Sequence, residues 1–469
     1  MRYVVVGGGL IGSYVAWRLA AKGYAVDLVE QGKSFEEEYL KSVGTNKKYR
    51  GGSEGRKAGL GGTSQVWGGL LVEPIFSELD NKWRYLETAI SENASAVKKI
   101  LGVEQQFLRV RSAFLGSNDI LLESESIVSQ VFVTLPILKR NIFFYFIKTK
   151  KRDKKNINIW KDLRVNRICH QNNKINSIEC SNPQGRTMLL PVGKLILCTG
   201  ALGNVQILAR LLGSKLRTEH GLSDHLSCRV ARVNVLNAKE FYKNFSPRVL
   251  SRGTIIGRRL ILKNTAIPHY FTFQSDRRNQ LFRIVKILLR GDFKKFLVEI
   301  TKIKNPFLEI MLLIKYFVAG GMVFSETDEV FLHLDFSSEI SKGGDIGFES
   351  EAGIDAINGP LLGRSDFDAI DRFLKSFYKA FQLELSDICE LNPLPSEAIR
   401  ESISDTYHPC GVYPILANGA INLDGRVRDF DNLFVTGTGL LPDAGNANPT
   451  FAALCLSEHM VNAMVEEEQ

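Results

Sequence analysis

The feature that most constrains the fold is a glycine turn close to the first residue. A short apolar run, residues 3–6, leads directly into a turn that carries Gly7, Gly9 and Gly12. Glycines at this spacing let a pyrophosphate approach the backbone and let a helix pack closely on a strand, with the helix N-terminus facing the anion. The sequence therefore predicts a strand, a helix and a second strand built around a dinucleotide.

An acidic residue follows at the expected place. Helical spacing continues from the turn to Gly23, and the next apolar run, residues 25–30, ends at Glu30. An acid here accepts a hydrogen bond from a ribose 2′-hydroxyl and disfavours a 2′-phosphate. A glycine-rich turn in an unrelated α/β domain is the alternative. The residues expected to contact the dinucleotide in this unit are Gly7, Gly9, Leu10, Ile11, Gly12 and Glu30.

A second glycine-rich stretch lies at residues 59–69, where five of eleven residues are glycine. This composition suits backbone that lies close against a ligand. We expect Gly62, Thr63, Trp67 and Gly68 to line the cofactor. Trp67 is equally compatible with simple packing in the core, because large aromatic side chains are usually buried.

Length and composition fit a globular protein of two interleaved domains. The chain has 469 residues, of which 44% are hydrophobic and 24% charged. The seven cysteines are widely spaced and odd in number, so we expect neither a disulfide framework nor a thiolate metal site. The first strand starts almost at the first residue, which leaves no room for a signal peptide and leads us to expect a cytoplasmic protein.

Positive charge is concentrated in the middle of the chain. Residues 239–315 hold 17 lysines and arginines against five acidic residues, although the whole chain carries only +9. Within residues 281–318, basic and apolar residues alternate in runs shorter than the ~20 residues of a spanning helix. This segment predicts peripheral contact with an anionic membrane, on its inner face, or binding of a lipid-linked or anionic substrate; the alternative is helices with a solvated basic face. No motif for nucleic acid accompanies the charge.

Four segments in the right order resemble the glucose-methanol-choline (GMC) oxidoreductases, most closely the pyranose oxidase and cholesterol oxidase branches. The segments are the second glycine-rich stretch with Val72-Glu73-Pro74, residues 194–204, residues 222–225, and the C-terminal stretches 407–411 and 432–450. Residues 226–404 match no pattern. The resemblance implies a bound FAD and oxidation of an alcohol carbon.

The resemblance also implies particular site residues. His408, in Tyr-His-x-x-Gly, is expected to take the hydroxyl proton, and a histidine suits this because its pKa lies near neutrality. Asn448 is expected to hydrogen-bond the substrate oxygen, although it could also cap the last helix. Asp224 and His225 are interpreted as a structural segment near the domain junction. The remaining cofactor contacts are Val165, Gly200, Gly439, Leu440, Pro449 and Thr450.

Three positions depart from the family pattern. Val412-Tyr413-Pro414 follows the histidine motif where many members carry a hydroxyl residue and Met-Gly. Gly437-Thr438-Gly439 stands where many members of the family carry an acidic residue in a turn. Val66 stands where some members attach FAD through a histidine, so we expect a non-covalent FAD.

The sequence thus predicts an α/β protein in which a Rossmann-like FAD-binding domain (1–80, 156–225 and 405–469) is interleaved with an α+β substrate-binding domain (81–155 and 226–404). Alternating short runs between residues 157 and 197 predict a small antiparallel sheet. The expected reaction takes hydride from a carbohydrate or glycan-precursor CH–OH group and passes electrons to an unidentified acceptor. The alternatives are a non-redox lyase or isomerase, and a membrane-associated flavoprotein that oxidises no alcohol.

Overall fold

The computed structural model describes most of the chain. The described residues are 2–32, 49, 51, 55–115, 121, 124–136, 139–149, 156–212, 221–250, 253–275, 293–301, 311, 329–338, 345–349, 353–359, 362–415 and 419–468. The predicted basic segment 281–318 therefore lies outside them, except for residues 293–301 and 311. Within these ranges, no helix combines the length and apolarity that crossing a bilayer requires.

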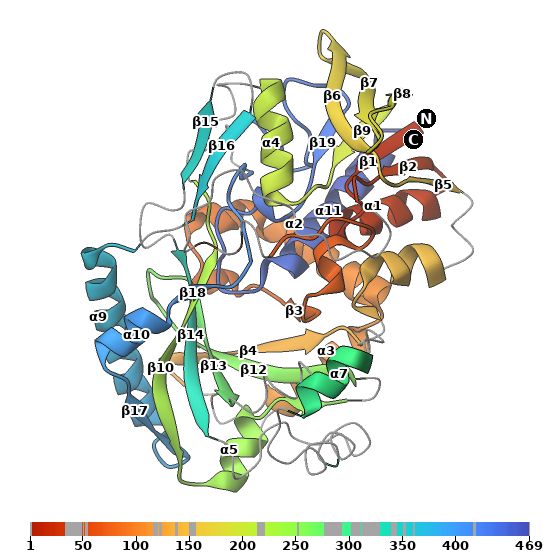
Figure 1. Ribbon diagram of the computed structural model, residues 1–469. Helices are drawn as coiled ribbons and strands as arrows, with labels where there is room; N and C mark the ends of the chain where they lie inside the picture. Colours follow the sequence, from red (N-terminus) through yellow and green to blue (C-terminus); the bar gives the residue numbers. More distant parts are fainter. Residues whose placement is uncertain are drawn as a thin grey trace.

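A parallel sheet forms the upper half of the molecule (Figure 1). Among the described residues it has five strands, in the order β19 (Leu433–Val435), β9 (Lys194–Leu197), β1 (Arg2–Val6), β2 (Ala25–Val29) and β5 (Ile157–Trp160). All neighbours pair in parallel. The central strands are buried along almost their whole length, as expected for a sheet covered on both faces. The predicted strand–helix–strand opening is confirmed.

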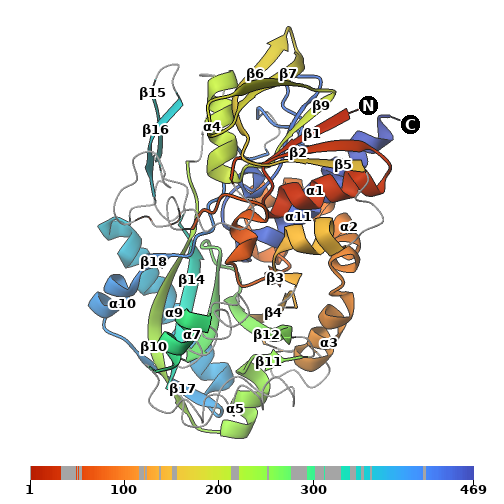
Figure 2. The ribbon, with the colours of Figure 1, turned by 45° about the vertical axis from the view of Figure 1, so that its right-hand side comes forward.

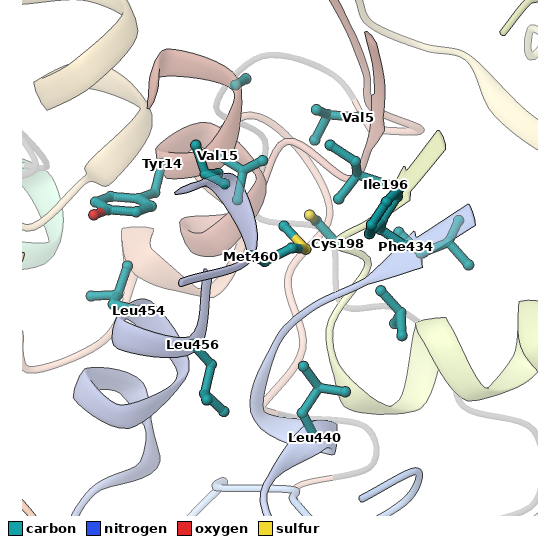
Figure 3. Close-up of a cluster of buried hydrophobic side chains, with 14 of the residues drawn as sticks. Val5, Tyr14, Val15, Ile196, Cys198, Phe434, Leu440, Leu454, Leu456 and Met460 are labelled. Carbon is teal, nitrogen blue, oxygen red and sulfur yellow. The ribbon is translucent and has the colours of Figure 1, made fainter. Parts of the chain in front are cut away.

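Three helices flank this sheet. The first, α1 (Leu10–Ala21), joins β1 to β2, and the last, α11 (Pro449–Glu466), packs against it. Figure 3 shows the cluster that they enclose, in which Val15, Ile196 and Phe434 point toward Met460. The third, α4 (Ala201–Leu212), follows β9. Burying one such apolar side chain contributes about 1.5–3 kcal/mol, so this cluster fixes the sheet to the C-terminal helix.

The predicted small antiparallel sheet exists but is shorter than expected. It contains β6 (Arg164–Gln171), β7 (Lys174–Ser181) and β8 (Thr187–Pro191). Residues 157–160 instead form β5 at the edge of the parallel sheet. Two hydrogen bonds hold them there, because Asn158 and Trp160 both donate to the carboxylate of Asp27 on β2.

A second, antiparallel sheet forms the lower half (Figures 1 and 2). Nine strands are described, and its main path is β17 (Cys389–Pro393), β10 (His225–Val235), β14 (Val330–Ser337), β13 (His269–Ser275), β12 (Ile255–Leu262), β4 (Ile127–Thr134) and β3 (Leu70–Val72). Two short strands, β11 (Arg248–Val249) and β18 (Ser404–Asp405), pair with β12 and β10.

One face of this sheet packs against a long helix, α9 (Arg364–Leu385). Phe271 of β13 stacks on Phe373 and Phe377 of that helix. Leu260 of β12 lies directly opposite Phe271 and faces the same core. Because side chains alternate along a strand, residues 259 and 270 face the opposite side, toward the rest of the molecule. The short helices α5 (Ala238–Phe245) and α10 (Ser396–Ser402) complete this lobe.

The remaining elements connect the two sheets. Helix α2 (Asn81–Leu101) packs against α11, and α3 (Glu104–Phe114) lies against β4 and β12. Trp83 and Phe107 belong to the core cluster of the parallel sheet. The short helix α7 (Phe293–Ile300) and a separate hairpin, β15 (Asp345–Glu349) with β16 (Gly353–Asn358), are also described. The predicted domain boundaries remain a prediction.

Candidate active site

The two glycine-rich stretches meet at the end of β1. The amide of Gly61 donates to the carbonyl of Gly8 at 2.7 Å. A Cβ at Gly62 would lie 2.9 Å from Cα of Gly9, and one at Gly12 would lie 1.8 Å from the carbonyl oxygen of Gly7. Side chains are therefore excluded where the turns pack on one another. The structure brings together two predicted motifs that are fifty residues apart in sequence.

The turn leaves a helix terminus available to an anion. Gly9 is the N-cap residue of α1 and provides no side-chain cap. The first amides of a helix, here from Leu10 and Ile11, have no partner within the helix and attract a negative group. A Cβ at Gly68 or Gly200 would meet no atom within 4 Å. These residues fit a pyrophosphate-containing cofactor.

Glu30 organises this region through its carboxylate. It accepts three backbone N–H groups, from Gly8 at 2.7 Å, Gly32 at 2.8 Å and Gly59 at 3.0 Å. The side chain is buried, which raises its pKa, while these hydrogen bonds act in the opposite direction. The Gln31 amide also interacts with this carboxylate, so backbone N–H groups hold it on several sides, and the predicted ribose contact stays a prediction.

The other predicted cofactor residues differ in burial. Thr63 is exposed, in the 3₁₀ turn Gly62–Gln65. Trp67 is half-buried against the core and donates to the carbonyl of Arg140 at 2.7 Å. Val165 lies on β6, half-buried against that core. Val66, the position of a covalent attachment in some relatives, is half-buried.

The C-terminal block contributes a second rim. Gly439 and Leu440 lie in a short turn, Thr438–Leu440, which contacts both α4 and α11. A Cβ at Gly439 would lie 2.3 Å from the ring of Tyr413, so this turn also requires glycine. Pro449 and Thr450 begin α11. The helix start is thereby placed beside the loop that carries His408.

The His408 loop is held in a fixed shape. Tyr407 has a φ of 64°, a conformation that costs a bulky residue energy and is usually found where the surroundings impose it. The amide of His408 donates to the carboxylate of Asp224 at 2.8 Å, and Cys410 exchanges backbone hydrogen bonds with Ser223. Asp224 therefore positions the loop, in agreement with the structural role expected for it.

His408 and Asn448 lie side by side, as the family resemblance implies. Nδ2 of Asn448 is 3.1 Å from Nε2 of His408. Although Asn448 is the N-cap residue of α11, its side chain makes no capping hydrogen bond. Its Oδ1 accepts instead from Nη2 of Arg259. Asn448 thus stands at the N-cap position without a side-chain cap, and its hydrogen bond to the substrate oxygen stays a prediction.

These contacts determine which nitrogen and oxygen atoms of the site carry hydrogen. A guanidinium has only donors, so the atom of Asn448 that faces Arg259 is the oxygen. Its NH2 group then faces His408, and because NH2 can only donate, Nε2 must offer a lone pair. Arg259 thus sets the amide orientation that leaves Nε2 of His408 ready to accept a proton.

The other ring nitrogen of His408 carries the hydrogen. Nδ1 is 2.9 Å from Oγ1 of Thr406, whose hydroxyl donates to the carbonyl of His225. It is also 3.3 Å from Nδ1 of His225. The second ring nitrogen of His225, Nε2, lies 2.9 Å from the carbonyl of Gly445 and must donate to it, so Nδ1 of His225 is an acceptor. His408 is held in one neutral tautomer.

Burial and neighbouring charge keep the imidazole neutral. The pKa of His408 is lowered well below its usual value by burial first and then by His225 and Arg259. Burial also lowers the pKa of His225 to about 4. Asp224, in contrast, has its pKa raised to about 8 by burial. A neutral histidine whose Nε2 carries no hydrogen is in the state that a general base requires.

Sequence reasoning missed two residues of this site. His225 was interpreted as structural, yet its ring contacts the ring of His408. Arg259 lies in the segment that matches no motif, and it comes from β12 of the antiparallel sheet. The available signal was the pair Arg258-Arg259 inside an otherwise apolar strand, because a charged side chain is almost never fully buried without a reason.

With the geometry in place, comparison with known families identifies the chain. Residues 366–457 match the family profile described as GMC oxidoreductase, and residues 5–35 match one described as an NAD(P)-binding Rossmann-like domain. The C-terminal part of the chain is a GMC oxidoreductase domain. The matched ranges contain both His408 and Asn448 at one end and the glycine turn at the other.

Solved structures share the fold over the whole length. Pyridoxine 4-oxidase from Mesorbium loti has a TM-score of 0.57 and 15% identity, with 99% of each chain covered. Formate oxidase has a TM-score of 0.56 and 13% identity, covering 99% of this chain and 98% of the other. A formate oxidase from Aspergillus oryzae RIB40 is similar, with a TM-score of 0.55 and 13% identity over 99% of this chain and 98% of that one. No curated protein sequence matches significantly.

This GMC oxidoreductase is therefore an FAD-dependent enzyme of the α/β class, as predicted. The turn at Gly7, Gly9 and Gly12, the carboxylate of Glu30 and the start of α11 would hold the FAD. The particular residues assigned to the cofactor stay predictions, as does the closer resemblance to the pyranose oxidase and cholesterol oxidase branches.

Proposed function

We propose that this GMC oxidoreductase oxidises an alcohol carbon to a carbonyl, with His408 as the general base. The observation that supports this most directly is the hydrogen-bond chain from Arg259 through Asn448 to His408, which leaves the Nε2 lone pair facing the amide of Asn448 at 3.1 Å. A group in this state removes a proton at neutral pH, and a positioned base contributes typically ~10²–10⁴-fold to such a reaction.

The roles of the side chains follow from the same geometry. A substrate hydroxyl that enters between the two residues donates its hydrogen to Nε2 of His408, and its oxygen accepts from Nδ2 of Asn448. As the C–H bond breaks, His408 takes the hydroxyl proton and the carbon becomes a carbonyl. Bound FAD supplies the acceptor for the hydride. Thr406 and His225 hold the Nδ1 hydrogen in place during the transfer.

The substrate class is less constrained than the reaction. The similar structures are named for oxidases of pyridoxine and formate, so they give the predicted carbohydrate or glycan substrate no support. That prediction and the non-covalent attachment of FAD, inferred from Val66, are retained as proposals. The same holds for an electron acceptor of unknown identity and for membrane contact through residues 281–318.

The experiment is anaerobic reduction of the bound flavin. The purified protein should be yellow, and acid precipitation should release the flavin into the supernatant if it is not covalently bound. Addition of alcohols and sugars without oxygen should bleach the flavin absorbance, and His408→Ala should bind flavin but bleach far more slowly. A protein that binds FAD, is bleached by no alcohol or sugar, yet converts a substrate without net redox would establish the lyase or isomerase alternative instead.

A further inference from the structure

One cation of the site has more hydrogen-bonding capacity than the protein uses. Arg259 is 4% exposed, and its Nε and Nη1 atoms have no hydrogen-bond partner. Among the described residues, Nη2 donates to Asn448, and the side chain of Tyr270 also interacts with the guanidinium. Within the described part of the chain, Arg259 forms no ion pair: no carboxylate oxygen lies within 4 Å of its guanidinium, whereas other arginines do have such partners. A buried arginine in this condition is costly, because buried charges are normally paired.

The surroundings of Arg259 hold the guanidinium without neutralising it. Its Cζ lies 3.8 Å from the ring centroid of Tyr270 and 5.7 Å from that of Phe132. An aromatic face attracts a cation but leaves its in-plane N–H groups free to bind another partner. Asp335 lies on β14, which is separated from β12 by β13; it is buried and interacts with Arg259 at longer range. The arginine is therefore positioned flat over Tyr270, with N–H groups left over.

A second unsatisfied group lies beside it. Gln130 of β4 is the cross-strand neighbour of Arg259 and is 3% exposed. Its Nε2 donates to the carbonyl of Glu73 at 3.0 Å, whereas its Oε1 has no partner. Two adjacent buried side chains thus lack partners on the sheet face opposite the α9 core. A few such groups in a native protein normally point to a bound ligand or water.

The unpaired arginine is also joined to the reacting position. Arg259 binds Asn448, and Asn448 binds the nitrogen of His408 that accepts the proton. A small molecule whose hydroxyl lies at His408 can therefore place a second group at Nε or Nη1 of Arg259. The guanidinium is suited to carboxylates because its planar array of donors matches two oxygens.

We propose that the substrate is a hydroxy acid: an alcohol that carries a carboxylate, which Arg259 binds while the hydroxyl lies between His408 and Asn448. The inference rests on the proposed function and specifies its substrate class. The carboxylate provides the missing counter-charge, and the reaction converts the carbinol to a carbonyl while the carboxylate is unchanged. Gln130 offers an acceptor to a second hydroxyl of the same molecule.

The flavin is the other group that could use this positive charge, because a reduced flavin is an anion. The two possibilities differ in what a variant changes. A carboxylate contact makes the preference for charged substrates depend on Arg259. A flavin contact makes the redox potential of the flavin depend on Arg259, with neutral and charged substrates affected alike.

The test uses matched substrates that differ only in charge. The pairs are glycolate with 1,2-ethanediol, and 4-(hydroxymethyl)benzoate with 1,4-benzenedimethanol. Flavin bleaching by each is measured as kcat/KM for the wild type, Arg259→Lys, Arg259→Gln and Arg232→Gln. The last is a control that removes one charge from an exposed position of the same sheet, where Arg232 pairs with Glu329.

The expected result is a preference for the charged member of a pair of about 10- to 100-fold, since a hydrogen bond to a charged group is worth that much. Arg259→Gln should abolish the preference, Arg259→Lys should retain part of it, and Arg232→Gln should keep it. Comparing ratios within a pair removes any general loss caused by mispositioned Asn448. Wild-type enzyme that bleaches with neutral alcohols as readily as with the acids would overturn the hydroxy-acid proposal and leave alcohol oxidation standing.

A binding measurement separates the two proposals if no compound bleaches the flavin. Formate, acetate and benzoate are titrated while flavin absorbance and melting temperature are followed, which needs no turnover. Binding that weakens about 10-fold or more in Arg259→Gln, but not in Arg232→Gln, supports the carboxylate site even if alcohol oxidation fails. The absence of such binding, or a change of flavin potential in Arg259→Gln without a change in carboxylate affinity, refutes it.

Discussion

The two sheets of this enzyme build their parts of the site from different atoms. The parallel sheet offers mostly backbone to the predicted cofactor site: glycine turns, the first amides of α1, and a carboxylate, Glu30, that accepts backbone N–H groups. The antiparallel sheet contributes side chains, Arg259 and Gln130, that stand on one face with unused hydrogen bonds. The spacing of glycines specifies the part built on the parallel sheet, and single side chains specify the part built on the antiparallel sheet. The predicted cofactor site and the proposed substrate site therefore depend on different kinds of sequence constraint.

The largest effect is expected where the two halves join. His408→Ala removes the base and should slow flavin reduction by about 10²–10⁴-fold. Because His408 belongs to none of the hydrophobic core clusters, flavin content should stay close to that of the wild type. Stopped-flow measurement of bleaching under anaerobic conditions provides the rate.

Asp224 provides the matched control for that variant, since it holds the backbone of the same loop through the amide of His408. Asp224→Asn keeps its size and one acceptor oxygen, so a small loss of rate is expected there. If His408→Ala reduced the flavin as fast as Asp224→Asn, the imidazole would not be the base.

The next effect tests the backbone half. In Glu30→Gln one carboxylate oxygen becomes an NH2 group, which cannot accept from Gly8, Gly32 or Gly59. One buried N–H is then unsatisfied, at a cost of about 1–3 kcal/mol, and FAD affinity should fall by about 10- to 100-fold. Flavin fluorescence during dialysis measures the affinity. The rate per bound flavin should hardly change, and a variant that bound FAD normally would show that the amide network does not shape the cofactor site.

The same contrast explains what could be predicted from the sequence. The parallel sheet could be predicted, because a strand that is buried on both faces must be apolar throughout and a turn that packs against backbone must contain glycine. Lys194–Leu197 and the helix from Pro449 follow directly from such rules. Ile157–Trp160 was misassigned because its apolar run is short, and short runs do not distinguish neighbouring sheets.

The antiparallel sheet was harder for a physical reason. Its strand pairs β10–β14 and β12–β4 join residues that are about a hundred or more positions apart, so no local spacing indicates which side chains meet. Arg259 becomes a site residue only because strand pairing places it over Tyr270 and beside Asn448. His408 and Asn448 were accessible through a motif, whereas Arg259 and His225 needed the fold.

A negative charge placed beside His408 should shift the pH dependence of kcat/KM. In the wild type the pKa of His408 is held well below its usual value, so kcat/KM should stay level as the pH falls through 6.5 and decline only at lower pH. Asn448→Asp puts a carboxylate beside Nε2, which favours the protonated imidazole. The acid limb should then move up by about 1–3 pH units.

Asn448→Ala is the control, because it removes the amide and adds no charge. Its kcat should fall, but the acid limb should remain near that of the wild type. An acid limb at the same pH in both variants would mean that the titrating group is not His408.

The smallest effect concerns the tautomer of His408. Thr406→Val keeps the shape of the side chain but removes the hydroxyl that lies 2.9 Å from Nδ1. The Nδ1 hydrogen keeps one partner, Nδ1 of His225 at 3.3 Å, so the loss is limited to one neutral hydrogen bond of about 0.5–1.5 kcal/mol, or roughly a 2- to 10-fold fall in flavin reduction. Thr406→Ser retains the hydroxyl and should behave like the wild type. If the Thr406→Val and Thr406→Ser variants reduced the flavin at the same rate, His225 alone would fix the tautomer of His408. The antiparallel sheet would then control the base, because His225 is the first residue of β10.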